Sequence, residues 1–163
     1  MAEGAATYSE SEWAAIGPGR PLKGLPAEQL LLLHRHYVWT ILQKTAFVDE
    51  LTLDPSRARP SGGQLPLADK PLAAMYLWYA LLWATIEGLR QRHIPVGGEL
   101  DADIKLVSPT LRRCRDSVFH IPRERYYDDR LFALMNDQDS ALRIRRITSG
   151  LGRLFIEELD ARR

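Results

Sequence analysis

Arg115 and His120, in the segment RCRDSVFHIP, are the side chains best suited to chemistry on a phosphodiester. Histidine titrates near neutral pH, so His120 can accept a proton from a ribose 2′-hydroxyl. Arginine presents a planar fork of N–H donors, so Arg115 can hold the non-bridging oxygens of a phosphate and stabilise the charge that develops there. The pair therefore contains the two groups that RNA cleavage without a metal ion requires.

The spacing of this pair carries little information by itself, because Arg113 and Arg115 both precede His120 at spacings that an arginine-rich chain produces by chance. On a continuous helix, five residues separate two side chains by about 140°. Arg115 and His120 therefore converge only if the helix ends between them or a second chain supplies another copy. Pro122 disfavours helical geometry at the residue before it, so we expect the helix to end near His120.

A structural interpretation of the same segment stands beside the catalytic one. Arg115 can form a salt bridge with Asp116 or Glu87, and His120 can hydrogen-bond the carbonyl groups at a helix end. The flanking basic residues are Arg112, Arg113, Arg123 and Arg125. Each of these can belong to a solvated surface of mixed charge or can contact RNA phosphates, in which case binding weakens steeply with salt.

Other kinds of site are not indicated by the sequence. His34 and His36 lie two residues apart, so on a helix they point about 200° apart and cannot share a metal ion. No Glu-x-x-His pair, phosphate-binding Gly-x-x-x-x-Gly-Lys loop or Gly-x-Ser-x-Gly turn occurs. Cys114, the single cysteine, lies on an apolar helical stripe and is expected in the core. We therefore expect neither a metal ion nor a cofactor.

The elements that must position these residues are helical. Apolar residues recur at helical spacing over residues 26–53, and a second run, 71–93, is apolar on nearly all faces in its first part. A third helix is expected from Ser108, which can cap it, with Pro109 in the first turn. The last long helix is expected over 139–161. The sequence thus predicts an all-α fold, an up-and-down bundle of four main helices with short accessory helices such as 128–135.

The second of these helices carries the most apolar stretch, Leu72 to Ile86. This stretch is shorter than the roughly 20 residues that span a bilayer, so we expect a buried core helix. Its large aromatic side chains either pack in the core, which is the default interpretation, or form a dimer surface. They are Tyr76, Trp78, Tyr79 and Trp83.

Length and composition indicate a single soluble domain. The 163 residues are 45% hydrophobic and 26% charged, as in an ordinary globular protein, and a net charge of +1 provides no global attraction to nucleic acid or to anionic membranes. One cysteine and the lack of a signal-peptide pattern favour a cytoplasmic protein. We expect no membrane partner and no DNA partner. We expect residues 1–24 to form a flexible arm and residues 25–163 a single domain, with a long loop at about 54–69.

The segment Arg-Asp-Ser-Val-Phe-His, residues 115–120, resembles the signature of the HEPN domain family: Arg, a small polar residue, and His after four to six intervening residues. The resemblance implies a metal-independent endoribonuclease, of a kind that often serves as a toxin or in phage defence. It implies that Arg115 and His120 are catalytic and that Asp116 and Glu87 support them.

The same resemblance implies RNA as the substrate, an antitoxin protein as a possible partner, and a homodimer whose two motifs face each other across the interface. Members that keep these residues can also bind RNA or protein without cleaving it. One position departs from the family: where antitoxin-paired members often carry a tyrosine two residues after the histidine, this chain has Pro122. Regulation through modification of that tyrosine is therefore not expected.

Overall fold

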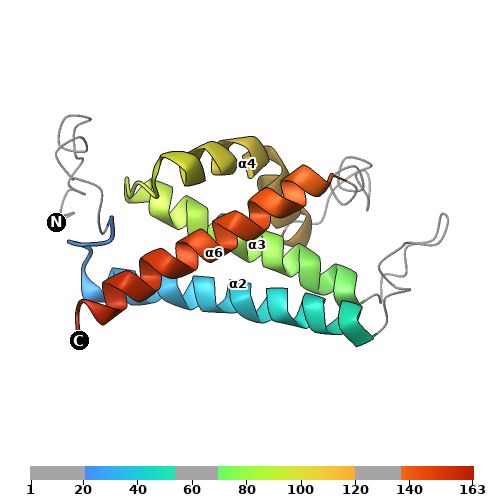
Figure 1. Ribbon diagram of the computed structural model, residues 1–163, viewed down its shortest axis with the longest axis horizontal. Helices are drawn as coiled ribbons and strands as arrows, with labels where there is room; N and C mark the ends of the chain where they lie inside the picture. Colours follow the sequence, from blue (N-terminus) through green and yellow to red (C-terminus); the bar gives the residue numbers. More distant parts are fainter. Residues whose placement is uncertain (1–20, 54–69, 120–136) are drawn as a thin grey trace.

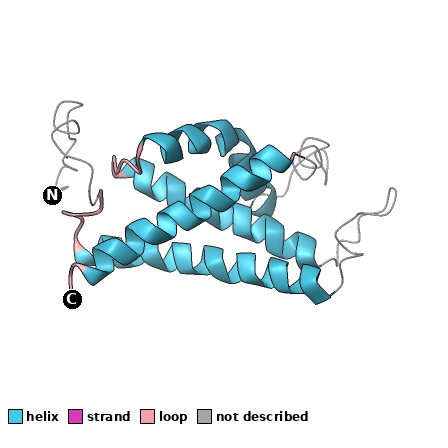
Figure 2. Ribbon diagram, in the orientation of Figure 1, coloured by secondary structure: helices cyan, strands magenta, loops and turns pink. Residues whose placement is uncertain are grey.

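The computed structural model describes residues 21–53, 70–119 and 137–163, and within these ranges all regular secondary structure is α-helical, as Figure 2 shows. The long helices are α2 (Ala27–Leu53), α3 (Lys70–Gln91), α4 (Gly98–Phe119) and α6 (Gln138–Asp160). The all-α fold class predicted from the sequence is confirmed. The accessory helix expected at 128–135, the loop at 54–69 and most of the arm lie outside the described residues.

The four helices pack so that α3 lies between α2 and α4, and α6 crosses over them (Figure 1). α2 packs against α3 along its length and touches α6, whereas α4 packs against α3 and α6. In Figure 1, α2 and α4 form opposite edges of the bundle. The core lies where the inward faces of the four helices meet.

α3 is the central helix of the bundle. Trp78, Tyr79 and Trp83 are all buried and Tyr76 is half-buried, so the core interpretation of the aromatic residues is confirmed. With 22 residues and a mean hydropathy of 1.3 over its most apolar window, α3 is long and apolar enough to cross a membrane by length and composition. However, 56% of that window is buried inside the bundle, as in a core helix.

The predicted start of the third helix, at Ser108, is wrong. α4 begins at Gly98 and continues through Ser108 and Pro109. Ser108 does not cap a helix: its Oγ donates to the carbonyl of Ile104, one turn earlier. Pro109 removes one backbone hydrogen bond, but its ring is exposed to solvent. An unbroken buried stripe outweighs this loss; its members are Ile104, Val107, Leu111 and Cys114.

Two buried glycines of α6, facing α4 and α2 in turn, allow these two helices to approach closely. A Cβ atom added at Gly150 would meet Leu100 Cδ2 of α4 at 2.9 Å, and one added at Gly152 would collide with the hydroxyl of Tyr37 from α2. Tyr37 Oη donates to the carbonyl of Thr148, 3.0 Å away. The crossing of α6 over α2 and α4 therefore depends on the missing side chains at these two positions.

The two ends of the described chain meet at one end of the bundle. Leu22, which the sequence assigned to the arm, is buried in the core. Arg162 Nη2 donates to the carbonyls of Leu22 and Leu25, and its Nε donates to the buried Glu158 at 2.6 Å. Residues 22–25 are thus held on the helical domain.

The first helix shows where the apolar pattern of the sequence misleads. Its buried or half-buried residues include Leu30, Leu33 and Tyr37, as helical spacing predicts. Val48, which has the same spacing, is exposed, and so are several large apolar residues on the opposite side of α2. A single apolar periodicity therefore does not account for this helix.

Candidate functional site

Arg115 lies near the end of α4, and two carboxylates hold its guanidinium. Nη1 donates to Glu87 Oε2 at 2.7 Å, while Nε and Nη2 donate to Asp116 Oδ1 at 2.9 Å and 2.7 Å. Glu87 belongs to α3, so this cluster joins two helices. The arginine that the sequence singled out and both of its expected supporting acids are therefore in direct contact.

The register between α3 and α4 brings these side chains together. Arg90 Nη2 donates to Ser108 Oγ at 3.3 Å, and Glu87, one turn earlier in α3, meets Arg115, two turns later in α4. α4 thus runs back along α3 at an angle, and its buried stripe fixes which of its residues reach Glu87. The buried stripe of α4 is part of the core, so the packing of the core also fixes the position of Arg115.

The electrostatics of the cluster keep Arg115 charged. Its pKa is raised above the ordinary value, first by the hydrogen bonds to Asp116 and then by the bond to Glu87. The side chain is 23% exposed and both carboxylates are more open, so a solvent-borne ligand can reach the cluster. Because two carboxylates surround one guanidinium, an approaching phosphate must compete with them for its N–H groups.

The predicted partner of Arg115 in catalysis, His120, lies outside the described residues, as do Arg123 and Arg125. The convergence of Arg115 with His120 therefore stays a prediction. Of the other expected RNA contacts, Arg112 is exposed and Arg113 is half-buried on α4. These two side chains are available beside the cluster, on neighbouring sides of the helix.

Cys114 is buried, and desolvation raises the pKa of its thiol to about 12. The expectation that it belongs to the core is confirmed. A thiol with so high a pKa is not a nucleophile at neutral pH.

The histidines inside the described ranges occupy separate structural positions. His34 packs against Phe155 with the ring centroids 5.6 Å apart, and His36 Nδ1 lies 2.9 Å from the carbonyl of Leu32. His93 is exposed just after α3, with a positive φ of 53°. Among the described residues, no group of three or more His, Cys, Asp and Glu side chains is placed to hold a metal ion.

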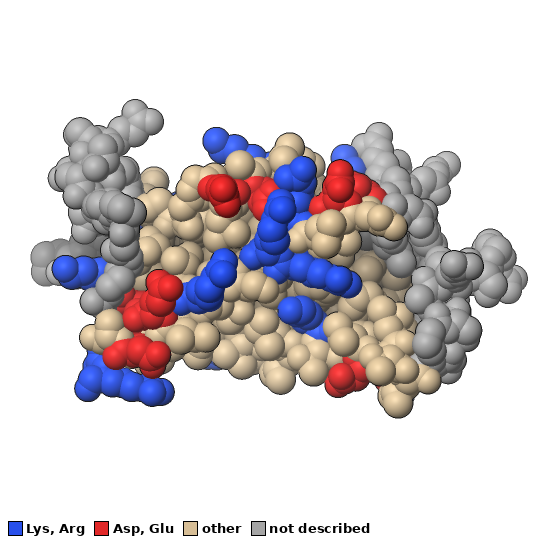
Figure 3. Space-filling model, viewed as in Figure 1, with Lys and Arg blue, Asp and Glu red and all other residues tan. Residues whose placement is uncertain are grey.

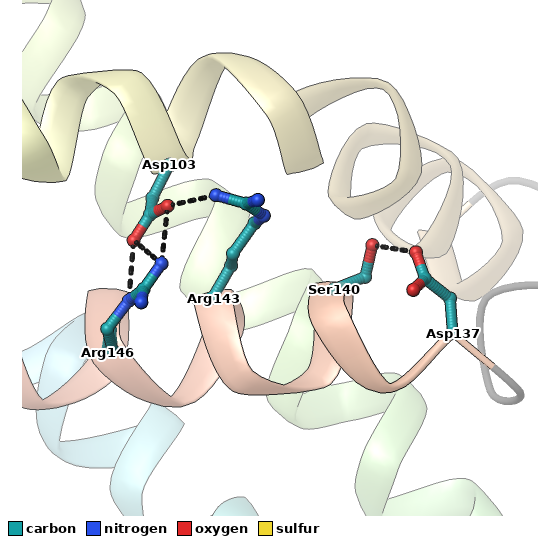
Figure 4. Close-up of polar contacts among 5 residues, drawn as sticks. All are labelled: Asp103, Asp137, Ser140, Arg143 and Arg146. Carbon is teal, nitrogen blue, oxygen red and sulfur yellow. Dashed lines mark hydrogen bonds and ion pairs between the residues drawn. The ribbon is translucent and has the colours of Figure 1, made fainter.

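A second polar cluster, which the sequence did not reveal, joins the first half of α4 to α6 (Figure 4). Asp103, with a side chain only 9% exposed, accepts from Arg143 Nη1 at 2.7 Å and from Arg146 Nε and Nη2 at 2.9 Å and 2.8 Å. These bonds, those from Arg146 foremost, hold the pKa of Asp103 below its ordinary value. The sequence indicated this cluster only through the position of Asp103, a carboxylate next to the buried stripe of α4.

The same two helices form an open groove of about 1050 Å³. It lies between the first turn of α4 and one face of α6, and Arg145, Arg146 and Arg153 line it on the α6 side. Figure 3 shows basic side chains gathered across the middle of this face with acidic ones around them. Glu99 and Glu157 also line the groove, so its charge is mixed rather than strongly basic.

Comparison of the chain with protein-family models, with curated proteins and with solved structures gives no match.

Proposed function

We propose that this protein is a metal-independent endoribonuclease of the HEPN-like kind, in which Arg115 stabilises the scissile phosphate and His120 acts as base and then as acid. The observation that supports this proposal is the organisation of Arg115. Carboxylates from two helices hold its guanidinium in one orientation at the surface, five residues before His120. A pre-oriented cation loses little entropy when it binds the charge of a transition state.

The proposed reaction is a transfer of the phosphoryl group within the RNA. His120 accepts the proton of the 2′-hydroxyl as the 2′-oxygen attacks phosphorus, and Arg115 donates to the non-bridging oxygens. The bond from phosphorus to the 5′-oxygen then breaks, and the protonated His120 returns a proton to the leaving oxygen. The products are a 2′,3′-cyclic phosphate and a 5′-hydroxyl end, and the imidazole is neutral again.

Glu87 and Asp116 have a positioning role in this proposal. Their bonds to Arg115 use three of its five N–H groups and orient the guanidinium plane. They also reduce the attraction of the site for phosphate before reaction. The arrangement therefore favours charge that develops in the transition state over the charge already present in the substrate.

The test is RNA cleavage in EDTA by the wild-type protein and by Arg115→Ala, His120→Ala and Lys105→Ala. Lys105 is exposed on the same helix, is not among the expected RNA contacts, and serves as the matched control. We expect cleavage with cyclic phosphate ends, a loss of at least about 100-fold in the first two variants and a small change in the third. Equal cleavage by all four proteins would overturn the proposal.

A second candidate is a binding module of the same fold that contacts RNA or protein without cleaving it. The observation in its favour is that two carboxylates already compensate the charge of Arg115, as in a structural salt bridge. RNA binding without cleavage, weakening steeply with salt, would favour this candidate. A neighbouring gene for a small antitoxin would favour the toxin or phage-defence role that we propose for the nuclease.

A further inference from the structure

The side of α2 that faces away from the bundle is apolar along most of its length. Leu31 and Leu42 are each 57% exposed and Leu53 is 81% exposed. We define the outer face of α2 as eleven exposed residues, with Arg35 and Asp49 its two charged members. The full set is Leu31, Leu32, Arg35, Val38, Trp39, Leu42, Thr45, Ala46, Asp49, Thr52 and Leu53.

These residues follow a seven-residue repeat. A central row contains Arg35, Leu42 and Asp49. The row on one side of it contains Leu32, Trp39, Ala46 and Leu53, and the row on the other side contains Leu31, Val38, Thr45 and Thr52. A repeat of seven on a straight, exposed helix is the pattern of a seam that packs against another helix.

The outer face is complementary to itself when it is turned end to end. A two-fold axis that relates two antiparallel copies lies in the plane of the contact, so each side row meets the same row of the partner. With the axis through Leu42, Leu32 of one copy lies opposite Leu53 of the other, and Trp39 lies opposite Ala46. In the other side row, Leu31 and Val38 lie opposite Thr52 and Thr45. Apolar residues therefore meet apolar residues along the first of these rows and at the centre of the contact.

The two charges on the outer face match under the same axis. Arg35 and Asp49 are equally far from Leu42, in opposite directions, so each Arg35 meets Asp49 of the other copy. The guanidinium of Arg35 lies over the ring of Trp39, with its Cζ 5.2 Å from the ring centroid, and is thus already held on this face. In a parallel pair, like charges would face each other instead.

From this pattern we infer that the outer face of α2 binds the same face of a second copy of this chain, antiparallel and centred on Leu42. The complementarity of both charge and apolar surface about one axis identifies the occupant as another copy rather than an unrelated helix.

This contact does not use α4, the helix that carries Arg115. The inner side of α2 packs against α3 and α6, and α4 also packs against α3 and α6, with α3 lying between α2 and α4 (Figure 1). A dimer through α2 therefore differs from the facing motifs that the HEPN resemblance implies, and each site would work with the arginine and histidine of one chain. The inference does not depend on ribonuclease activity.

The first experiment measures the mass of the full chain in solution as a function of concentration. We expect a dimer for the wild type and at least about 100-fold weaker association for Leu42→Glu, because two buried like charges meet at the axis. Leu106→Glu is the matched control: Leu106 is an equally prominent exposed leucine on α4, so its change should leave the dimer intact. A monomeric wild type, or an unaffected Leu42→Glu dimer, would overturn the inference.

Charge reversal gives a sharper test of the register. Arg35→Glu and Asp49→Arg should each be monomeric at concentrations where the wild type is dimeric, since each places like charges opposite one another twice. A mixture of the two variants should form a heterodimer, because both charge pairs are then opposite in sign. Failure of the mixture to associate would contradict the proposed register. If the mixture does form a dimer, that result also shows that both variants are folded.

Disulfide trapping distinguishes the antiparallel arrangement from a parallel one. Under mild oxidation Leu42→Cys should cross-link to itself, while Leu32→Cys should not, because its partner position is Leu53. The double variant Leu32→Cys/Leu53→Cys should cross-link. The native Cys114 is buried and does not interfere. Efficient cross-linking of Leu32→Cys alone would show a parallel pair and sink the proposal.

Discussion

Arg115 in α4 and Glu87 in α3 are joined by a hydrogen bond of 2.7 Å between Nη1 and Oε2, although 28 positions separate them in the chain. The bond forms because the buried stripe of α4 sets the register of the two helices. The bond links the central helix α3 directly to Arg115, the residue that we propose stabilises the scissile phosphate. Changes at Glu87 should therefore alter activity through the orientation of Arg115.

For Glu87→Gln, we expect kcat for RNA cleavage to fall about tenfold while KM is unchanged or lower. The amide keeps an acceptor for Arg115 but removes one of two charges that compete with the substrate phosphate. Single-turnover and steady-state cleavage assays would separate these two effects. Glu28→Gln, an exposed change in the first turn of α2, is the control. A higher KM with unchanged kcat would contradict the positioning role.

The Asp103 cluster should make stability depend on pH in the acid range. Because the pKa of Asp103 is below its ordinary value of 3.8 in the folded protein, its ion pairs stabilise the fold fully above that value and are lost as pH falls through the lowered pKa. Asp103→Asn should cost about 2–3 kcal/mol at pH 7 and much less near pH 2. Thermal unfolding at several pH values measures this.

A suitable comparison for that variant is Asp160→Asn. Asp160 forms an exposed ion pair with Arg163 at 3.4 Å, and its loss should change the free energy of unfolding by less than about 1 kcal/mol. If Asp103→Asn were no more destabilising than Asp160→Asn at neutral pH, the cluster between α4 and α6 would not be a significant part of the fold.

The close approach of α6 to α2 predicts a coupled pair of substitutions. Gly152→Ala should destabilise the protein by about 1–3 kcal/mol, because its methyl group would occupy the position of the Tyr37 hydroxyl. Combining it with Tyr37→Phe should cost less than the sum of the two single changes, since the hydroxyl is then absent. Denaturant unfolding of all four proteins gives the coupling energy; strict additivity would argue against the contact.

The two core tryptophans differ in their hydrogen bonding and should respond differently to replacement. Trp78 Nε1 donates to Thr148 Oγ1 at 3.3 Å, whereas Trp83 Nε1 is buried and has no hydrogen-bond partner among the described residues. Both indoles are nearly fully buried, so replacement by phenylalanine removes similar apolar area. Trp78→Phe should therefore destabilise by about 1 kcal/mol more than Trp83→Phe in denaturant unfolding. The reverse order would be inconsistent with this structure.

Local patterns in the sequence were enough to predict the helices whose signals agree along their whole length. α3 is apolar on nearly every side, and this pattern was enough to predict that it is a buried core helix. α6 combines an apolar face with an acidic start, and its observed bounds, Gln138–Asp160, differ from the predicted 139–161 by one residue at each end. In both cases spacing within a single helix determines the result, so no knowledge of the neighbouring helices was needed.

Of the candidate site, the sequence indicated Arg115, Asp116 and Glu87 through a motif and a resemblance, but it did not give their arrangement. Whether Glu87 reaches Arg115 depends on the register of α3 against α4, which is a property of the packed core. The role of His120 rests on the sequence alone, because this residue lies outside the described part of the chain.

What the sequence by itself determined is the all-α class and the identity of the buried aromatic helix, since both follow from residue types and their periodicity. Only the tertiary structure decided that α4 continues through Pro109, because burial of Ile104 and Val107 outweighs one lost backbone bond. It also decided which leucines of α2 remain exposed. Helical spacing shows that a residue is apolar, but a neighbouring helix must be present for that residue to be buried.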